Sequence, residues 1–199
     1  ADNNTAGGSS ALLVATAAGN TAVGYGCMNL NTTGIDNTAV GNNALFTNTI
    51  GTQNVAMGYN AMAANTTGVS NVAVGYNSLY TNTIGRYNTA LGYLALSKTT
   101  TGESNTAAGF MALYSNTTAS YNTALGSRAL KDNTTGNSNT ASGYQALKTN
   151  TTGNYNTATG YQSLQASTTG DRNTSIGRTS LALNTTGSCN TAVGMSALY

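Results

Sequence analysis

The sequence predicts an all-β protein, a β-solenoid (β-helix or β-roll) in which one 17-residue repeat makes one turn of the chain, called a coil below. Three observations support this: the repeat has no insertion or deletion, glycine recurs at fixed places, and charged residues are confined to fixed places. A fixed period is the sequence signature of architectures in which equivalent residues stack. The repeat opens on asparagine, at Asn20, Asn37, Asn54, Asn71, Asn88, Asn105, Asn122, Asn139, Asn156, Asn173 and Asn190.

We expect a single elongated domain of about 11–12 coils. Residues 1–19 are expected to form an irregular N-terminal coil, in which a weaker copy opens at Asn4, one residue short of the period. Residues 20–199 hold eleven copies in register, and the last copy is incomplete at Tyr199. The strict period argues against disorder, although only 6% of the residues are charged.

Strand is favoured over helix within each coil. No segment between glycines is long enough for the i, i+3, i+4, i+7 spacing of an amphipathic helix. Asparagine, threonine and glycine, which dominate the repeat, are poor helix formers. A coil of a β-solenoid, in which like positions pair their backbones, fits a unit of this length.

We number the repeat from 1 to 17, beginning at its asparagine. Apart from Asp2 in the irregular first coil, charged residues fall only at positions 6, 7, 10, 11, 16 and 17. Such side chains are almost never fully buried unless paired, so three exposed corners alternate with three protected segments, at positions 1–5, 8–9 and 12–15. A solenoid with three sides, one of them short, is therefore expected.

Stacking of equivalent residues predicts three structural rows. Asparagine at positions 1 and 12 can form amide ladders, and position 12 departs from asparagine only at Ala15, Thr99 and Ser167. Leucine or methionine at position 9 forms an apolar spine, and glycine at positions 5 and 15 allows sharp bends or positive φ. Members of these rows are Asn37, Asn54, Asn71 and Asn88 in the ladder, Leu45, Leu79, Leu96 and Leu113 in the spine, and Gly41 and Gly58 at the bends.

An aromatic row is expected on the surface at position 6, where its rings should stack. It is a candidate interface with a neighbouring protomer and a candidate binding row for glycans. Adjacent apolar positions, 3 with 4 and 8 with 9, should point to opposite faces of an extended segment, one to the interior and one to solvent or another chain. The row contains Tyr25, Tyr59, Tyr76, Tyr93, Tyr144 and Tyr161, with Phe110 among them.

Threonine is invariant at position 13 and frequent at position 2. In a solenoid these residues make regular, uncharged rows of hydroxyl and methyl groups, and such rows are candidates for binding ice. Threonine also suits β-structure for its own sake, which is the competing explanation. The candidate ice-facing row includes Thr49, Thr66, Thr83, Thr100 and Thr117.

Catalytic chemistry is not expected. The chain has no histidine, its five acidic residues are scattered, and no Cys/His cluster has metal-ligand spacing, so we expect no enzyme activity, cofactor or metal. A net charge of +2 gives no electrostatic footprint for nucleic acid, and no apolar run reaches the length of a membrane helix. Cys27 is expected in the core; Cys189 lies many coils away, which excludes an intramolecular disulfide and leaves an intermolecular one open.

The repeat resembles a known type. Residues Asn139 to Gly153 contain Asn-Thr-Ala-Ser-Gly-Tyr-Gln-Ala-Leu followed by Asn-Thr-Thr-Gly. This pattern is similar to the repeats of bacterial and viral tail-fibre-like and adhesin-like proteins, which often end in an endosialidase-type chaperone domain. It is more loosely similar to the heads of trimeric autotransporter adhesins, whose unit is shorter. The resemblance implies an extracellular protein of a cell or virion surface, often trimeric.

Three hypotheses about function follow. The first is a structural subunit of an extracellular fibre, or a shaft module, whose copies assemble end to end or laterally because open sheet edges invite pairing. The second is an ice-binding solenoid, and the third is an adhesin or tail-fibre segment that binds glycans or a host surface. Asn-x-Thr triplets would accept glycans only if exposed, and an inward asparagine ladder hides them. Six of these triplets begin at Asn31, Asn65, Asn116, Asn133, Asn150 and Asn184.

Overall fold

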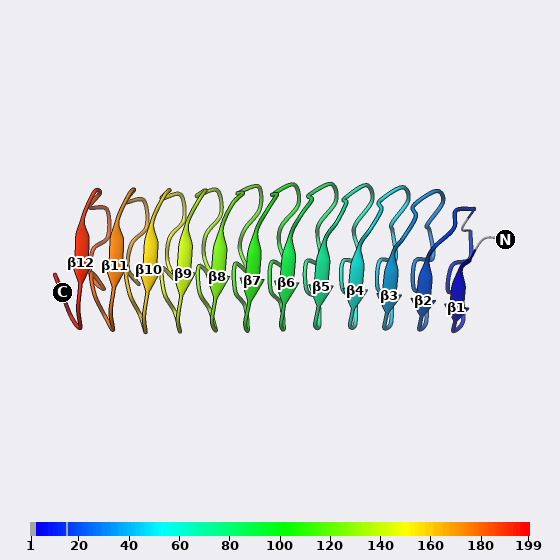
Figure 1. Ribbon diagram of the computed structural model, residues 1–199, viewed down its shortest axis with the longest axis horizontal. Coiled ribbons are helices and arrows are strands. Elements are labelled where there is room, and N and C mark those ends of the chain that lie inside the picture. Colours follow the sequence, from blue (N-terminus) through cyan, green and yellow to red (C-terminus); the bar gives the residue numbers. More distant parts are fainter. Residues whose placement is uncertain (1–2, 15) are drawn as a thin grey trace.

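The computed structural model describes residues 3–14 and 16–199; Ala1, Asp2 and Ala15 lie outside the described residues. The chain forms a rod, a β-solenoid whose twelve parallel strands make one sheet in sequence order, and no described residue is helical (Figure 1). The predicted fold class is therefore confirmed. The strands are β1 (Thr5–Gly7), β2 (Thr21–Val23), β3 (Thr38–Val40), β4 (Val55–Met57), β5 (Val72–Val74), β6 (Thr89–Leu91), β7 (Thr106–Ala108), β8 (Thr123–Leu125), β9 (Thr140–Ser142), β10 (Thr157–Thr159), β11 (Thr174–Ile176) and β12 (Thr191–Val193).

Each strand pairs with the strand one repeat away. Thr21 lies opposite Thr38 and Ala22 opposite Ala39, a register of 17 residues that continues along the rod. Only the pairing of β1 with β2 differs, because Thr5 lies opposite Thr21, 16 residues away. One coil therefore adds one strand to the sheet, and equivalent side chains lie above one another at about 4.8 Å.

Only one of the three protected segments is a strand, the one at positions 2–4. The other two are turns whose backbones nevertheless pair from coil to coil. In the third and fourth coils, for example, the amide of Leu45 donates to the carbonyl of Ala61 at 3.0 Å, and that of Thr49 donates to Thr66 at 3.0 Å. Backbone groups are thus satisfied on all sides of the rod, although only one side is a sheet.

The expectation that adjacent apolar positions face opposite ways holds for positions 3 and 4 but is wrong for positions 8 and 9. In β6, Ala90 is buried and Leu91 is exposed, as in any extended strand. Ala44 and Leu45, at positions 8 and 9, are both fully buried. The reason is the backbone: Leu45 has a φ of 51°, and this left-handed residue turns the chain so that both side chains face the interior.

Glycine recurs at positions 5 and 15 of the repeat for two different structural reasons. Gly75 at position 5 has a φ of 133°, a backbone conformation that side-chain-bearing L-residues rarely adopt. Gly51 at position 15 has no positive φ, but a Cβ there would lie 2.5 Å from the carbonyl oxygen of Gly68 in the next coil. Position 5 therefore needs glycine for the bend, while glycine at position 15 allows the close approach of neighbouring coils; Ala119 is the one exception at position 15 among the in-register copies.

The core is one narrow column. Alanine at position 3, a small residue at position 8 and leucine or methionine at position 9 fill it, and the predicted spine of Leu45, Leu79, Leu96 and Leu113 is fully buried. Burying each leucine contributes roughly 1.5–3 kcal/mol, while ordering each backbone residue costs roughly 1–2 kcal/mol. A single coil therefore cannot be stable alone, and stability depends on contacts between coils.

Candidate functional site

The asparagine at position 1 forms a continuous ladder inside the rod. The Oδ1 atom of Asn37 accepts from both the backbone amide and the Nδ2 atom of Asn54, at 3.0 and 3.1 Å. The same contacts join Asn71 to Asn54 and Asn88 to Asn71. Because every member both donates and accepts along the rod axis, each coil sets the register of the next.

A second ladder at position 12 meets the first at a glycine. The Nδ2 atom of Asn65 donates to Oδ1 of Asn48 at 2.7 Å and to the carbonyl of Gly68 at 3.2 Å. That carbonyl also accepts from Nδ2 of Asn54, at 2.9 Å. The shared acceptor ties position 1 to position 12 across the interior, so the ladders close each coil as well as linking it to its neighbours.

Six of the Asn-x-Thr triplets begin on this second ladder. Asn31, Asn65, Asn116, Asn133 and Asn150 are fully buried, and each donates its side-chain nitrogen to a backbone carbonyl. Asn184, in the eleventh coil, is half-buried and donates in the same way. In these six triplets the nitrogen that a glycan would modify is thus engaged in a hydrogen bond within the folded rod, whereas Asn3, which begins the triplet Asn3-Asn4-Thr5, is exposed.

The threonine hydroxyls at position 13 are also used internally. Thr49 donates through Oγ1 to the carbonyl of Thr66 at 3.0 Å, and Thr66 donates in turn to Thr83 at 3.0 Å. Thr83, Thr100 and Thr117 continue the pattern. The candidate ice-facing row therefore directs its hydroxyl protons to the backbone of the next coil.

The outer face of the sheet carries a different pair of rows. Threonine or valine at position 2 is half-buried or exposed, and no position 2 hydroxyl makes a side-chain hydrogen bond among the described residues. Position 4 is mostly aliphatic and exposed, as at Val74, Leu91 and Leu125, which expose 37%, 41% and 43% of their surface. No charged residue stands at either position. This face is therefore regular, uncharged and partly apolar.

The aromatic row at position 6 borders this face and is stacked in two segments. The rings of Tyr59, Tyr76, Tyr93 and Phe110 follow one another with centroids 5.2–5.4 Å apart and planes within 10° of parallel. Tyr144 and Tyr161 form a second stack. Because stacked rings cover each other's faces, the row presents mainly ring edges and hydroxyls to solvent.

Tyr25 stands apart from these stacks, because Asn42 occupies position 6 in the next coil. Ser127 likewise separates Phe110 from Tyr144. The guanidinium of Arg128 lies over the ring of Phe110, 5.6 Å from its centroid, and that of Arg178 lies 5.9 Å from the centroid of Tyr161. A cation thus lies over the last ring of each stack, at its C-terminal end.

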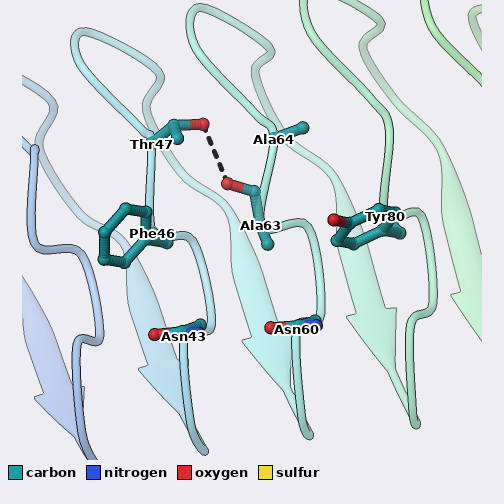
Figure 2. A pocket seen from close by; sticks show the side chains of 7 residues that line it. All are labelled: Asn43, Phe46, Thr47, Asn60, Ala63, Ala64 and Tyr80. Atoms are coloured by element: carbon teal, nitrogen blue, oxygen red, sulfur yellow. Dashed lines mark hydrogen bonds between the residues drawn. The ribbon is translucent and has the colours of Figure 1, made fainter.

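A surface cleft that the sequence analysis did not anticipate lies at positions 7, 10 and 11. Figure 2 shows Phe46 and Tyr80 on either side of Ala63, with Asn43 and Asn60 along one wall. The signal in the sequence was the pair Ala63 and Ala64, which puts two small residues in one coil between coils that carry Phe46 and Tyr80 at position 10.

The cysteines are free and differ in exposure. Cys27 is buried, and its Sγ donates to the carbonyl of Gly41 at 2.6 Å. Burial raises the pKa of the Cys27 thiol above its ordinary value. Cys189 is exposed.

Within the described ranges, no group of three or more His, Cys, Asp or Glu residues could hold a metal ion. No helix of membrane-spanning length and apolarity occurs in that part of the chain either. The described residues thus form internal ladders, regular surface rows and the cleft beside Ala63, and a second cleft lies at the last coil, lined by Leu181, Leu183, Asn184, Asn190, Leu198 and Tyr199. Comparison with known protein families, curated sequences and solved structures found no match for this chain.

Proposed function

We propose that this chain is a structural module of an extracellular fibre, a stiff shaft on a cell or virion surface. The observation that carries the proposal is the pair of internal asparagine ladders, in which each coil offers its neighbour the donors and acceptors that it receives from the other side. An interface of this head-to-tail kind is open and repeatable, and it is the kind that builds filaments.

The regularity of the rod supports a mechanical role. All pairings from β2 to β12 keep the same register, so no long loop interrupts the shaft (Figure 1). In such a quasi-one-dimensional fold, length grows with coil number while each coil contacts only its neighbours. Twelve strands span roughly 50 Å at the usual strand spacing. The extracellular setting is part of the proposal and follows the resemblance to fibre repeats.

The outer face of the sheet is the proposed lateral contact, and its proposed occupant is a second copy of this chain. Parallel sheets are normally covered on both faces, and here the outer face carries exposed Val74, Leu91 and Leu125 without any charge. A partner that meets a side-chain row at every coil must share the coil spacing, which a second copy does. With its aromatic border, a face roughly 50 Å long approaches the roughly 800 Å² per partner of a stable interface.

The test combines shape and mass in solution. Negative-stain electron microscopy should reveal rods or bundles, and light scattering should give a mass above that of one chain. Leu91→Lys with Leu125→Lys should reduce the mass to one chain, because each lysine would have to be desolvated in the contact. Ser115→Lys is the matched control, since position 11 already carries Lys98 in the preceding coil. A compact, non-elongated particle would overturn the structural role, and an unchanged mass in the double variant would overturn this lateral contact.

Ice binding is the second candidate, and one observation favours placing it on the same outer face. The position 2 hydroxyls of Thr106, Thr123 and Thr140 are free of side-chain hydrogen bonds to described residues, whereas those of the position 13 row are engaged. Thermal hysteresis and ice-crystal shaping are the measurements. Thermal hysteresis that is lost in Thr123→Lys but kept in Ser115→Lys would support this candidate. Equal freezing and melting points in the parent protein would exclude it.

A further inference from the structure

The cleft between Phe46 and Tyr80 lies where a small residue, Ala63, stands between two large side chains at position 10 of successive coils. Its volume is about 280 Å³, and it is lined by Asn43, Phe46, Thr47, Asn60, Ala63, Ala64 and Tyr80. At positions 10 and 11 the fourth coil contributes only the methyl groups of Ala63 and Ala64, so the surface is hollow there. The cleft is small, with room for one ring-sized group.

The spacing of its walls follows from the coil rise. Phe46 and Tyr80 stand two coils apart, at roughly 9.6 Å along the rod, and the fourth coil leaves the space between them empty. In the neighbouring row, where every coil carries a ring, the centroids lie 5.2–5.4 Å apart. A six-membered ring placed over Ala63 would therefore lie about one stacking distance from each aromatic side chain.

The walls are not two parallel plates. In Figure 2 the ring of Phe46 is seen nearly face-on and that of Tyr80 nearly edge-on. Such walls suit the puckered body of a pyranose better than a flat aromatic ring sandwiched between faces. The Tyr59 to Phe110 stack differs, because its inner rings, Tyr76 and Tyr93, are covered on both faces by their neighbours.

The two side-chain amides that line the cleft are neutral and make no side-chain hydrogen bond to a described residue. The side-chain amides of Asn43 and Asn60 lie side by side along one wall, and neither bonds to another lining residue (Figure 2). Their backbones are held at φ values of 54° and 51°, which fixes where the amides point. On the next coil, Oδ1 of Asn77 is buried without a partner. A side-chain amide offers two donors and an acceptor, which match the neighbouring hydroxyls of a sugar.

The floor of the cleft is held in place. Oγ1 of Thr47 donates to the carbonyl of Ala63 at 2.8 Å (Figure 2), and the carbonyl of Asn65, at 3.1 Å, is a second acceptor for the same proton. These bonds tie the third coil to the fourth at the base of the cleft. No lining residue is charged, so neither an acidic nor a basic ligand would find a counter-charge there.

We propose that this cleft binds a neutral pyranose unit of a glycan, with Phe46 and Tyr80 packing against the ring and Asn43 and Asn60 bonding its hydroxyls. The site acts in a single chain, so it does not depend on the fibre role. One small open cleft gives weak binding, with a dissociation constant in the millimolar range. Repetition of the site along or across assembled fibres would raise the overall affinity.

Saturation-transfer NMR with the methyl glycosides of glucose, galactose, mannose and N-acetylglucosamine tests the proposal. At least one glycoside should receive saturation from the protein, and Ala63→Tyr should weaken its binding about tenfold or more by filling the cleft. The matched control is Gln165→Tyr, which adds the same ring at position 10 outside the cleft and should bind as the parent does. Circular dichroism checks that both variants fold.

A second variant separates the amides from the shape of the cleft. Asn60→Gly keeps the positive φ without strain and removes the amide, so it should also lose binding, whereas Met111→Gly at the same coil position should not. Absence of transfer to all four glycosides would overturn the proposal. Transfer that persists in Ala63→Tyr, or tighter binding of N-acetyltyrosinamide than of any glycoside, would also overturn it.

Discussion

The side-chain oxygen of Asn82 is buried beneath Thr99 without a hydrogen-bond donor. The two residues stand at position 12 of successive coils, where an asparagine in place of Thr99 would donate its amide. Asn150, which precedes Ser167, has the same unpaired Oδ1 atom. The gaps in the second ladder are thus located where the sequence departs from asparagine, and they mark weak joints between coils.

Thr99→Asn should therefore stabilise the rod. The new Nδ2 would donate to Asn82, and the new Oδ1 would accept from Asn116, whose Nδ2 now reaches the Thr99 hydroxyl at 3.3 Å. A buried polar group left unpaired costs about 1–3 kcal/mol, so we expect a gain of about 1 kcal/mol. The midpoint of guanidinium denaturation should rise. Thr101→Asn, on the exposed part of the same coil, is the control, and a lower midpoint for Thr99→Asn would contradict the ladder argument.

Gly75→Ala should be severely destabilising, by about 3 kcal/mol or more. Position 5 holds a φ of 133°, and a Cβ there would lie 2.5 Å from the carbonyl oxygen of Gly92. Gly7→Ala is a matched control in β1, because its Cβ would meet only Val23, at 4.0 Å. Thermal denaturation followed by circular dichroism compares the two, and equal melting temperatures would show that the coil contact at position 5 tolerates a side chain.

Asn42→Tyr should extend the aromatic row by joining Tyr25 to the stack that begins at Tyr59. Each new ring pair is worth roughly 0.5–1.5 kcal/mol beyond its buried area. We expect a higher denaturation midpoint and a stronger near-ultraviolet dichroism signal. Gln53→Tyr, at position 17 between Asp36 and Ser70, adds a ring without aromatic neighbours and should change neither. If Asn42→Tyr changes neither the denaturation midpoint nor the dichroism signal, stacking along this row does not stabilise the rod.

The two cysteines should react differently with iodoacetamide. Cys189 is exposed and should be alkylated in the folded protein, whereas Cys27 is buried and should react only after denaturation. Mass spectrometry of the labelled peptides measures this. Any covalent dimer should run through Cys189 and vanish from non-reducing gels in Cys189→Ser. Rapid labelling of Cys27 in the native protein would contradict its burial.

The raised pKa of Cys27 also has a consequence for stability. Burial keeps the Cys27 thiol protonated in the folded chain. As the pH rises past the ordinary thiol pKa of 9.0, the unfolded chain therefore loses this proton at a lower pH than the folded chain does. The contribution of Cys27 to stability is therefore full below that pH and declines as the pH rises toward the folded-state pKa. Cys27→Ala should lessen the alkaline loss of stability, as measured by denaturation between neutral pH and pH about 10.

Much of the fold could be predicted from the period alone. The exact 17-residue period predicted the solenoid, the asparagine ladder and the leucine spine, because each side chain in register lies between equivalent side chains of the coils above and below. The restriction of charged residues to positions 6, 7, 10, 11, 16 and 17 predicted the exposed corners. The prediction failed at positions 8 and 9, because an alternating pattern assumes an extended backbone and Leu45 is left-handed. Asparagine at position 7 in three successive coils, Asn43, Asn60 and Asn77, was an available sign of left-handed backbone nearby.

The candidate site was less predictable. Threonine at position 13 looked the same in the sequence as threonine at position 2, yet Thr66 donates to the next coil while Thr123 points out from the sheet. The cleft at Ala63 depended on which side chains from three coils meet at one corner, and the period does not specify this.

The sequence by itself determined that this protein is a column of equal coils, because an exact repeat places identical residues at identical heights. Only the tertiary structure decided which hydroxyls are free, which aromatic faces are covered and where the surface is hollow. These properties depend on side-chain directions and on contacts between coils, and a left-handed φ or a missing ring changes them without disturbing the repeat.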